Sequence, residues 1–138
     1  MSRLTFREIE CPECGLKQKC NIYESINVTS DPDLKEALFQ GKINIFKCHK
    51  CGHQSIIDNS LLYHDIEKEF LVQYYPFSCL SNDSFLEGFT RQGEPEWIYS
   101  PKLPKKLLRY RKWIHVVFSM DELIRYISFR DRLHERWS

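Results

Sequence analysis

Apolar and polar residues alternate along much of the chain in the way that half-buried β-strands require. The pattern begins at residues 4–9 and resumes after a short interruption at 19–29. Further strands are predicted at 42–48, 53–57 and 60–76, the last of these as a hairpin. Together these segments predict an antiparallel sheet of about four to six strands.

A short helix is predicted between the second and third strands, at residues 30–41. Ser30 or Asp31 can cap its start, Pro32 suits its first turn, and Gly41 suits its end. Its buried face is expected to carry Leu34, Ala37 and Leu38. This helix would be the connection between two strand pairs.

A longer helix is predicted near the C-terminal end, from Met120 to Arg136. Ser119 and Glu122 form the Ser-x-x-Glu capping box that opens such a helix. Its apolar residues fall in two adjacent stripes: Met120, Leu123, Ile124 and Ile127, and then Tyr126, Phe129, Leu133 and Trp137. A helix with so wide an apolar face should pack on the sheet or on a second copy of itself.

The periodicity fails between residues 77 and 104, where turn and breaker residues predict a long loop or arm before a final strand at 113–118. The fold class predicted is therefore α+β: an antiparallel sheet with two zinc knuckles, a short helix between them and a C-terminal helix. We expect residues 1–138 to form a single domain. Within it, a zinc-ribbon-like knuckle lobe would span 4–57, and the sheet, basic segment and C-terminal helix would span 58–138.

Composition supports a globular protein in a reducing compartment. Of 138 residues, 42% are apolar and 28% charged, which suits one folded domain. No apolar run approaches the roughly 18 residues of a membrane span, so we expect a cytoplasmic protein without a membrane partner. In that compartment the six cysteines predict a metal site rather than disulfides.

The cysteines of two Cys-x-x-Cys-Gly motifs are the candidate metal ligands. They are Cys11, Cys14, Cys48 and Cys51. Zinc favours four soft ligands in a tetrahedron, and two such turns can supply them. Gly15 and Gly52 follow the motifs, where they permit positive φ and let backbone N–H groups face the thiolates. The sequence therefore predicts one shared Zn²⁺ site.

Other interpretations of these cysteines remain open. Rubredoxin also uses two Cys-x-x-Cys-Gly knuckles, so iron is the alternative metal. A thioredoxin-type redox pair needs a strand-to-helix setting that neither motif has. Possible additional ligands are Cys20, His49, His53 and Cys79. We interpret these as buried thiols and surface histidines.

The chain resembles the CpXC family, a functionally uncharacterised family named for the knuckle "CPEC", whose second copy here is "CHKC". The resemblance extends through "INVTSDPDLKEALFQGKINIFKCHKCGH" and "LLYHDIEKEFLVQYYP" to "VVFSMDELIRYISFRDRL". The resemblance implies a cysteine arrangement similar to that of zinc ribbons, and it implies no particular function. His49 stands where the family often has proline.

Charge is uneven along the chain, although the net charge is +1. Residues 102–138 hold ten Lys/Arg against four Asp/Glu, a net of +6, and residues 1–101 carry −5. A basic run, 102–112, interleaves cations with Tyr110 and, just beyond it, Trp113. Its cations are Lys102, Lys105, Lys106, Arg109, Arg111 and Lys112. This mixture suits contacts with RNA or DNA, and equally a solvated face with Tyr110 and Trp113 as core anchors.

Three functions follow from these observations. The first is a non-enzymatic zinc-binding protein, whose four-cysteine site staples an interaction module with a protein partner, or a second copy, on the C-terminal helix. Nucleic-acid binding through the basic run 102–112 is the alternative. The third is an enzyme with a site near His64 and Asp65, although neighbouring strand residues point to opposite faces and Asp favours a hairpin turn.

Overall fold

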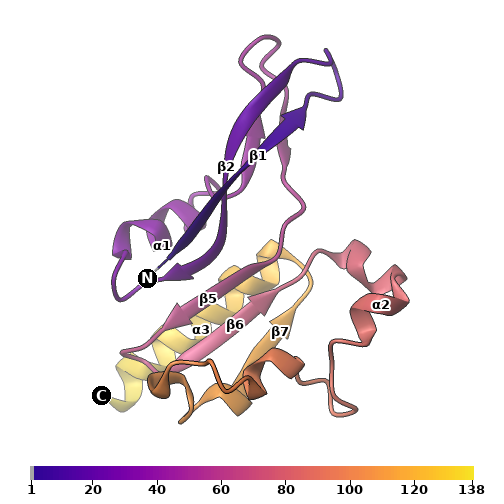
Figure 1. Cartoon of the computed structure of the whole chain (residues 1–138). Helices are drawn as coiled ribbons and strands as arrows, with labels where there is room; N and C mark the ends of the chain where they lie inside the picture. The colour runs from indigo at the N-terminus through magenta and orange to yellow at the C-terminus, as the bar shows by residue number, and fades with distance from the viewer. Residues whose placement is uncertain (1) are drawn as a thin grey trace.

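The computed structural model describes residues 2–138 and shows an α+β protein that ends in a long helix (Figure 1). Strands β1 (Arg3–Glu10) and β2 (Lys17–Asn27) pair antiparallel in a hairpin that projects beyond the rest of the molecule. Beside it, β3 (Ile45–Lys47) and β4 (Gln54–Ile56) form a second, shorter hairpin. The predicted α+β class and C-terminal helix are confirmed.

The main sheet is mixed, so the prediction of a wholly antiparallel sheet is wrong. Its strand order is β1-β2-β5-β6-β7, with β5 (Leu61–Asp65), β6 (Phe70–Tyr74) and β7 (His115–Val117), while β3 and β4 make a separate two-stranded sheet. The pairs β2–β5 and β6–β7 are parallel. Parallel neighbours need long crossover connections, and the segments 28–60 and 75–114 supply them. Alternation within a strand predicts the strand but not the direction of its neighbour.

Helix α1 (Pro32–Phe39) lies in the first crossover, as predicted. Asp31 precedes it without a side-chain capping bond, and its carboxylate accepts a hydrogen bond from the Ser2 backbone N–H at 3.2 Å. Gly41 follows the helix with a φ of +71°, a left-handed conformation that a glycine adopts without strain.

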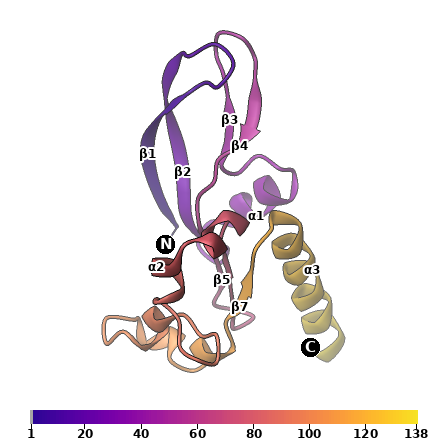
Figure 2. The same ribbon diagram turned by 90° about the vertical axis from the view of Figure 1, so that its right-hand side faces the viewer.

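Residues 77–114 of the second crossover form a segment that we call the arm. It contains short helical turns and no strand within the part that the structure describes: η1 (Phe77–Ser81), α2 (Asp83–Leu86), η2 (Glu96–Tyr99), η3 (Lys105–Leu107) and η4 (Arg111–Trp113). This agrees with the predicted loop or arm. The arm and helix α3 lie on opposite sides of the main sheet (Figure 2).

Helix α3 (Met120–Trp137) begins at the predicted capping box, where Ser119 Oγ accepts the Glu122 backbone N–H at 3.1 Å. Its first apolar stripe packs on the sheet, with Leu123 and Ile127 fully buried. The end of the second stripe is exposed: Phe129, Leu133 and Trp137. In the described part of the chain, no helix combines the length and the apolar character needed to cross a bilayer.

Buried side chains gather in two main clusters. The first, called the helix-covered core, lies between the sheet and α3: Ile26, Leu38, Ile43, Leu61, Tyr63, Phe70, Val72, Tyr74, Val117, Leu123 and Ile127. The second, called the cysteine end, lies between the two hairpins: Cys11, Cys20, Ile22, Phe46, Cys48 and Ile57. The division of the chain into lobes 4–57 and 58–138 stays a prediction.

Candidate metal centre

The two Cys-x-x-Cys turns have the same backbone geometry. In the β1–β2 turn, the Cys11 N–H donates to the Leu16 carbonyl at 2.8 Å and the Gly15 N–H donates to the Cys11 carbonyl at 2.9 Å. The corresponding two bonds recur around Cys48 in the β3–β4 turn. Gly15 and Gly52 both have a φ of +77°, the positive value predicted from the sequence. Each hairpin therefore ends in a rigid loop that carries two thiols.

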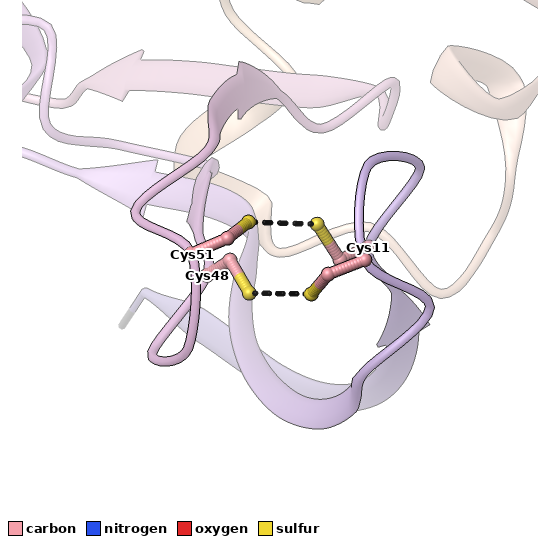
Figure 3. A group of neighbouring side chains, drawn as sticks. Cys11, Cys48 and Cys51 are labelled. Carbon is pink, nitrogen blue, oxygen red and sulfur yellow. Dashed lines mark hydrogen bonds between the residues drawn. The ribbon is translucent and has the colours of Figure 1, made fainter.

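The four thiols converge from the two loops (Figure 3). The Cys11 and Cys51 sulfurs lie 3.6 Å apart, those of Cys14 and Cys48 lie 3.5 Å apart, and all four sulfurs lie within 4.8 Å of one another. A disulfide would need about 2.05 Å, and all six cysteines are free. Zn–S bonds of about 2.3 Å in a tetrahedron require sulfurs roughly 3.8 Å apart. The spacing therefore fits four thiolates around one metal ion.

The electrostatics of the loops favour an anionic sulfur at Cys48 and oppose one at Cys51 and Cys14. Backbone N–H groups of Cys51 and Lys50 lower the pKa of the Cys48 thiol to about 6, against the opposite effect of burial. A backbone hydrogen bond from His53 lowers the pKa of Cys51, but burial and the neighbouring thiols, Cys11 first, raise it by more, to about 12. Close thiolates repel one another, and a divalent cation between them removes that penalty.

Gln18 clamps the two hairpins together beside the cluster. From β2, its Nε2 donates to the Lys47 carbonyl at 2.8 Å, and its Oε1 accepts the His49 backbone N–H at 3.0 Å. The second bond requires a residue other than proline at position 49, because proline has no N–H to donate. The sequence did not predict this role for Gln18, because the partner of a side-chain amide is set by tertiary structure.

Asn44 makes a second clamp at the base of the same two hairpins. Its Oδ1 accepts the Tyr23 backbone N–H at 2.8 Å, and its Nδ2 donates to the Tyr23 carbonyl at 3.0 Å. The side chain is buried, and the residue has a φ of +55°, which asparagine tolerates better than most residues. Strands β2 and β3 are thus joined by two side-chain amides, one at each end.

The other predicted candidate ligands lie outside the four-cysteine group. Cys20 is buried in the cysteine end, with its thiol 3.8 Å from the Gln18 carbonyl oxygen, and Cys79 is half-buried in the arm. His49 is exposed, and the His53 ring lies 6.5 Å from the Phe46 ring. Within residues 2–138, the group that could hold a metal contains only the four cysteines of the two motifs.

The six cations of the basic run lie on the arm and do not join the cysteine end. Five of them are exposed, whereas Arg111 is half-buried with its guanidinium 5.5 Å from the Tyr99 ring. Of the two predicted core anchors, Tyr110 is buried and Trp113 is 72% exposed. Arg109 contacts Glu69 at 3.4 Å. Most of the basic run is therefore accessible at the surface of the arm.

His64 and Asp65 make separate hydrogen bonds, with different partners. The Asp65 carboxylate accepts the Lys68 backbone N–H at 2.9 Å, which confirms its predicted role in the hairpin turn. The His64 Nε2 lies 2.7 Å from the Tyr110 hydroxyl, on the side of the sheet that faces the arm. Burial lowers the pKa of His64 to about 4, so its imidazole is neutral at pH 7. Nothing in this arrangement indicates catalysis.

Comparison with known families identifies the chain as a CpXC protein. A family model described as "CpXC: CpXC protein" matches residues 9–136, almost the whole length, so the chain belongs to this family. Searches of curated proteins and of solved structures found no match. The family assignment and the clustered cysteines together support metal binding, and they do not identify the metal.

Proposed function

We propose that this CpXC protein is a non-enzymatic zinc-binding protein, in which Cys11, Cys14, Cys48 and Cys51 hold one structural Zn²⁺. The observation that carries the proposal is the approach of four sulfurs, with opposite pairs at 3.5 and 3.6 Å, from two loops far apart in sequence. The ion would join the β1–β2 hairpin to the β3–β4 hairpin. Its contribution is to folding rather than to a reaction.

The ligand set supports a structural role. Catalytic zinc sites keep one position open for water, whereas four protein thiolates close the coordination sphere. The cysteine end also has few large buried side chains beside the thiols, namely Ile22, Phe46 and Ile57. Both hairpins are two-stranded where they carry the cysteines, since β2 pairs with β5 only at residues 25–27. A two-stranded segment is marginally stable in water and needs a further connection. The metal would supply it.

Metal analysis of the purified protein tests this proposal directly. We expect one zinc per chain, bound without visible absorption. Iron in the same thiolates would give a coloured, redox-active protein and would make the site rubredoxin-like instead. The protein can also be prepared in metal-restricted medium and then reloaded with zinc or iron. This experiment separates the site's own metal preference from the supply of each metal during expression.

Paired cysteine variants test the ligand assignment. Cys11→Ser should lose the bound metal, because three thiolates and a hydroxyl bind zinc far less tightly. Cys20→Ser is the matched control, since Cys20 is also buried at the cysteine end but lies outside the group of four. Full metal content in Cys11→Ser, or equal loss in both variants, would contradict the assignment.

We also propose that the metal-stapled fold serves as an interaction module, with a second copy of the chain as partner. Phe129, Leu133 and Trp137 follow one another at intervals of four residues on α3, and two of them are 55% and 77% exposed. Residues four apart share a helix face, so the three make one apolar line. Two such lines can cover each other in a symmetric dimer, because the same surface serves both partners.

Sedimentation across a range of protein concentrations tests the dimer. A dimer should form, and Phe129→Ser with Trp137→Ser should leave a folded monomer. The control is Leu86→Ser, because Leu86 is a similarly exposed apolar residue that lies on the arm and not on α3. A chain that stays monomeric at all concentrations would overturn the second copy as partner.

Nucleic-acid binding by the basic run is the second candidate. The observation in its favour is the exposed Trp113 beside exposed Lys112, which combines a stacking ring with a cation. Fluorescence anisotropy with RNA and DNA oligonucleotides should then show affinity that falls steeply with salt. Flat titrations at low salt would remove this candidate.

A further inference from the structure

A cavity of about 550 Å³ lies between the parallel pair β2–β5 and the η3 turn of the arm. Its walls are mainly apolar and include the side chains of Leu62, Ile66 and Leu107. This volume falls in the range of small-molecule sites. It is separated from the cysteine group, which none of its lining residues joins.

Two lysine side chains, Lys105 and Lys106, give this apolar cavity a basic character. No Asp or Glu lines it, and neither lysine forms an ion pair within residues 2–138. Arg109, three residues further on, is instead paired with Glu69. The two lysine charges are therefore left for a ligand.

His64 adds a neutral hydrogen-bonding group at the wall. Burial raises the pKa of Tyr110 to about 12, so its phenol keeps its proton and can donate to the His64 Nε2, 2.7 Å away. A neutral imidazole that accepts at Nε2 carries its proton on Nδ1. In that tautomer the Nδ1 proton has no hydrogen-bond partner in the described part of the chain and is available to an anion, whereas in the reverse tautomer Nε2 donates to the Tyr110 oxygen.

We propose that this cavity binds a small organic anion: a carboxylate or sulfonate on an aromatic or aliphatic body. The body would rest against Leu62, Ile66 and Leu107, and the anionic group would lie near Lys105 and Lys106. Charge complementarity selects this class, since a neutral apolar ligand would leave both lysines unused. The proposal assigns no reaction and does not depend on the metal site.

An NMR titration of the ¹⁵N-labelled full chain with 1-naphthoate tests the proposal, with neutral 1-naphthamide as the matched ligand. We expect saturable amide shifts at 25–27, 62–66 and 105–107, and about tenfold weaker binding of 1-naphthamide. Absence of saturable shifts at low-millimolar naphthoate would overturn the proposal. So would equal affinity for the two ligands.

Charge-matched variants locate the anion. Lys105→Gln with Lys106→Gln should weaken naphthoate binding by about tenfold, because both are exposed and neutralisation leaves the fold intact. Lys102→Gln with Lys112→Gln removes the same charge from the same run without touching the cavity, and should leave the affinity unchanged. Equal loss in both pairs would show a diffuse basic surface instead, and would contradict the site.

Discussion

The cysteine end and the helix-covered core are stabilised by different interactions. The core buries eleven side chains between a sheet and α3, with further apolar residues packed at its edge. The cysteine end joins two hairpins that share no strand ladder, through four thiols and the amides of Gln18 and Asn44. Hydrophobic burial is the dominant stabilising term where enough surface is covered. Where little is covered, ligation of a metal is expected to replace it.

The largest expected effect follows from removing a ligand. Cys48→Ser should unfold both hairpin tips while the helix-covered core stays folded, because structural zinc contributes about 10–16 kcal/mol of apparent binding free energy in small zinc domains. In ¹⁵N spectra, amide signals of residues 3–23 and 44–57 should collapse toward random-coil positions. Those of α3 should keep their dispersion.

Cys79→Ser is the control for this change, since Cys79 is half-buried in the arm and outside the group of four. It should give a spectrum close to that of the unaltered chain. If the amide signals of the whole chain lost their dispersion in Cys48→Ser, the two regions would unfold as one cooperative unit. That result would contradict the proposed difference between them.

Truncation of a side chain in the helix-covered core should have the opposite effect: it should lower stability and leave metal binding unchanged. Leu123 is fully buried, and Leu123→Ala should lower the free energy of unfolding by about 2–5 kcal/mol without altering metal content. Added metal should not restore the lost stability. Urea unfolding followed by circular dichroism measures the loss, with exposed Leu86→Ala as control, expected within about 0.5 kcal/mol of the unaltered chain.

The two regions also differ in how far the sequence could predict them. Strand alternation, Pro32, Gly41 and the Ser119 capping box are local signals, and the elements they predict are present. The spacing of the cysteine motifs predicted the group that the structure brings together. The parallel pairings were not predictable in this way, because they depend on where two long crossovers return.

The hydrogen bonds of Asn44 also depend on tertiary structure, and removing this side chain should have a moderate effect on stability. Asn44→Ala leaves the Tyr23 N–H and carbonyl without partners and places alanine at a φ of +55°. We expect a loss of about 1–3 kcal/mol in the metal-loaded protein. Asn44→Gly relieves the backbone strain and should lose less.

The matched control is Asn21→Ala, an exposed asparagine on β2. It should change stability by less than about 0.5 kcal/mol. An equally small effect of Asn44→Ala on the midpoint of urea unfolding would mean that the metal alone joins the hairpins.

The smallest expected effect concerns a charge network that ties α3 to α1 and the β5–β6 turn. The Asp131 carboxylate forms ion pairs with the Lys35 ammonium and, at 2.8 Å, with that of Lys68, and its side chain is mostly buried. Asp131→Asn should cost about 1–2 kcal/mol, between the values for exposed and buried ion pairs. Asp121→Asn makes the same chemical change at an exposed position of the same helix that forms no ion pair within the described residues, and is the control that should cost less.

The pH dependence of this loss follows from the pKa of Asp131. Burial opposes ionisation, but hydrogen bonds and charge from Lys35 and Lys68 lower the pKa below 3.8 overall. Because the pKa is lower in the folded protein, the ionised carboxylate contributes fully to the free energy of unfolding above pH 3.8, the pKa of an unperturbed Asp. This contribution is lost as the pH falls through the pKa of the folded state. The stability difference between the unaltered chain and the Asp131→Asn variant should therefore be constant from about pH 7 to about pH 5 and vanish in acid. A difference that persists unchanged down to about pH 2 would exclude this ionisation as its cause.

Hydrogen exchange by mass spectrometry, with and without a strong zinc chelator, tests the central claim most directly. The account predicts that chelation raises amide exchange in residues 3–23 and 44–57, while peptides from β5, β6 and α3 remain protected. Unchanged protection at the cysteine end after the metal is removed would contradict it. Exchange that rises uniformly along the chain would also contradict it, because the metal would then stabilise the whole fold and not the region that lacks an apolar core.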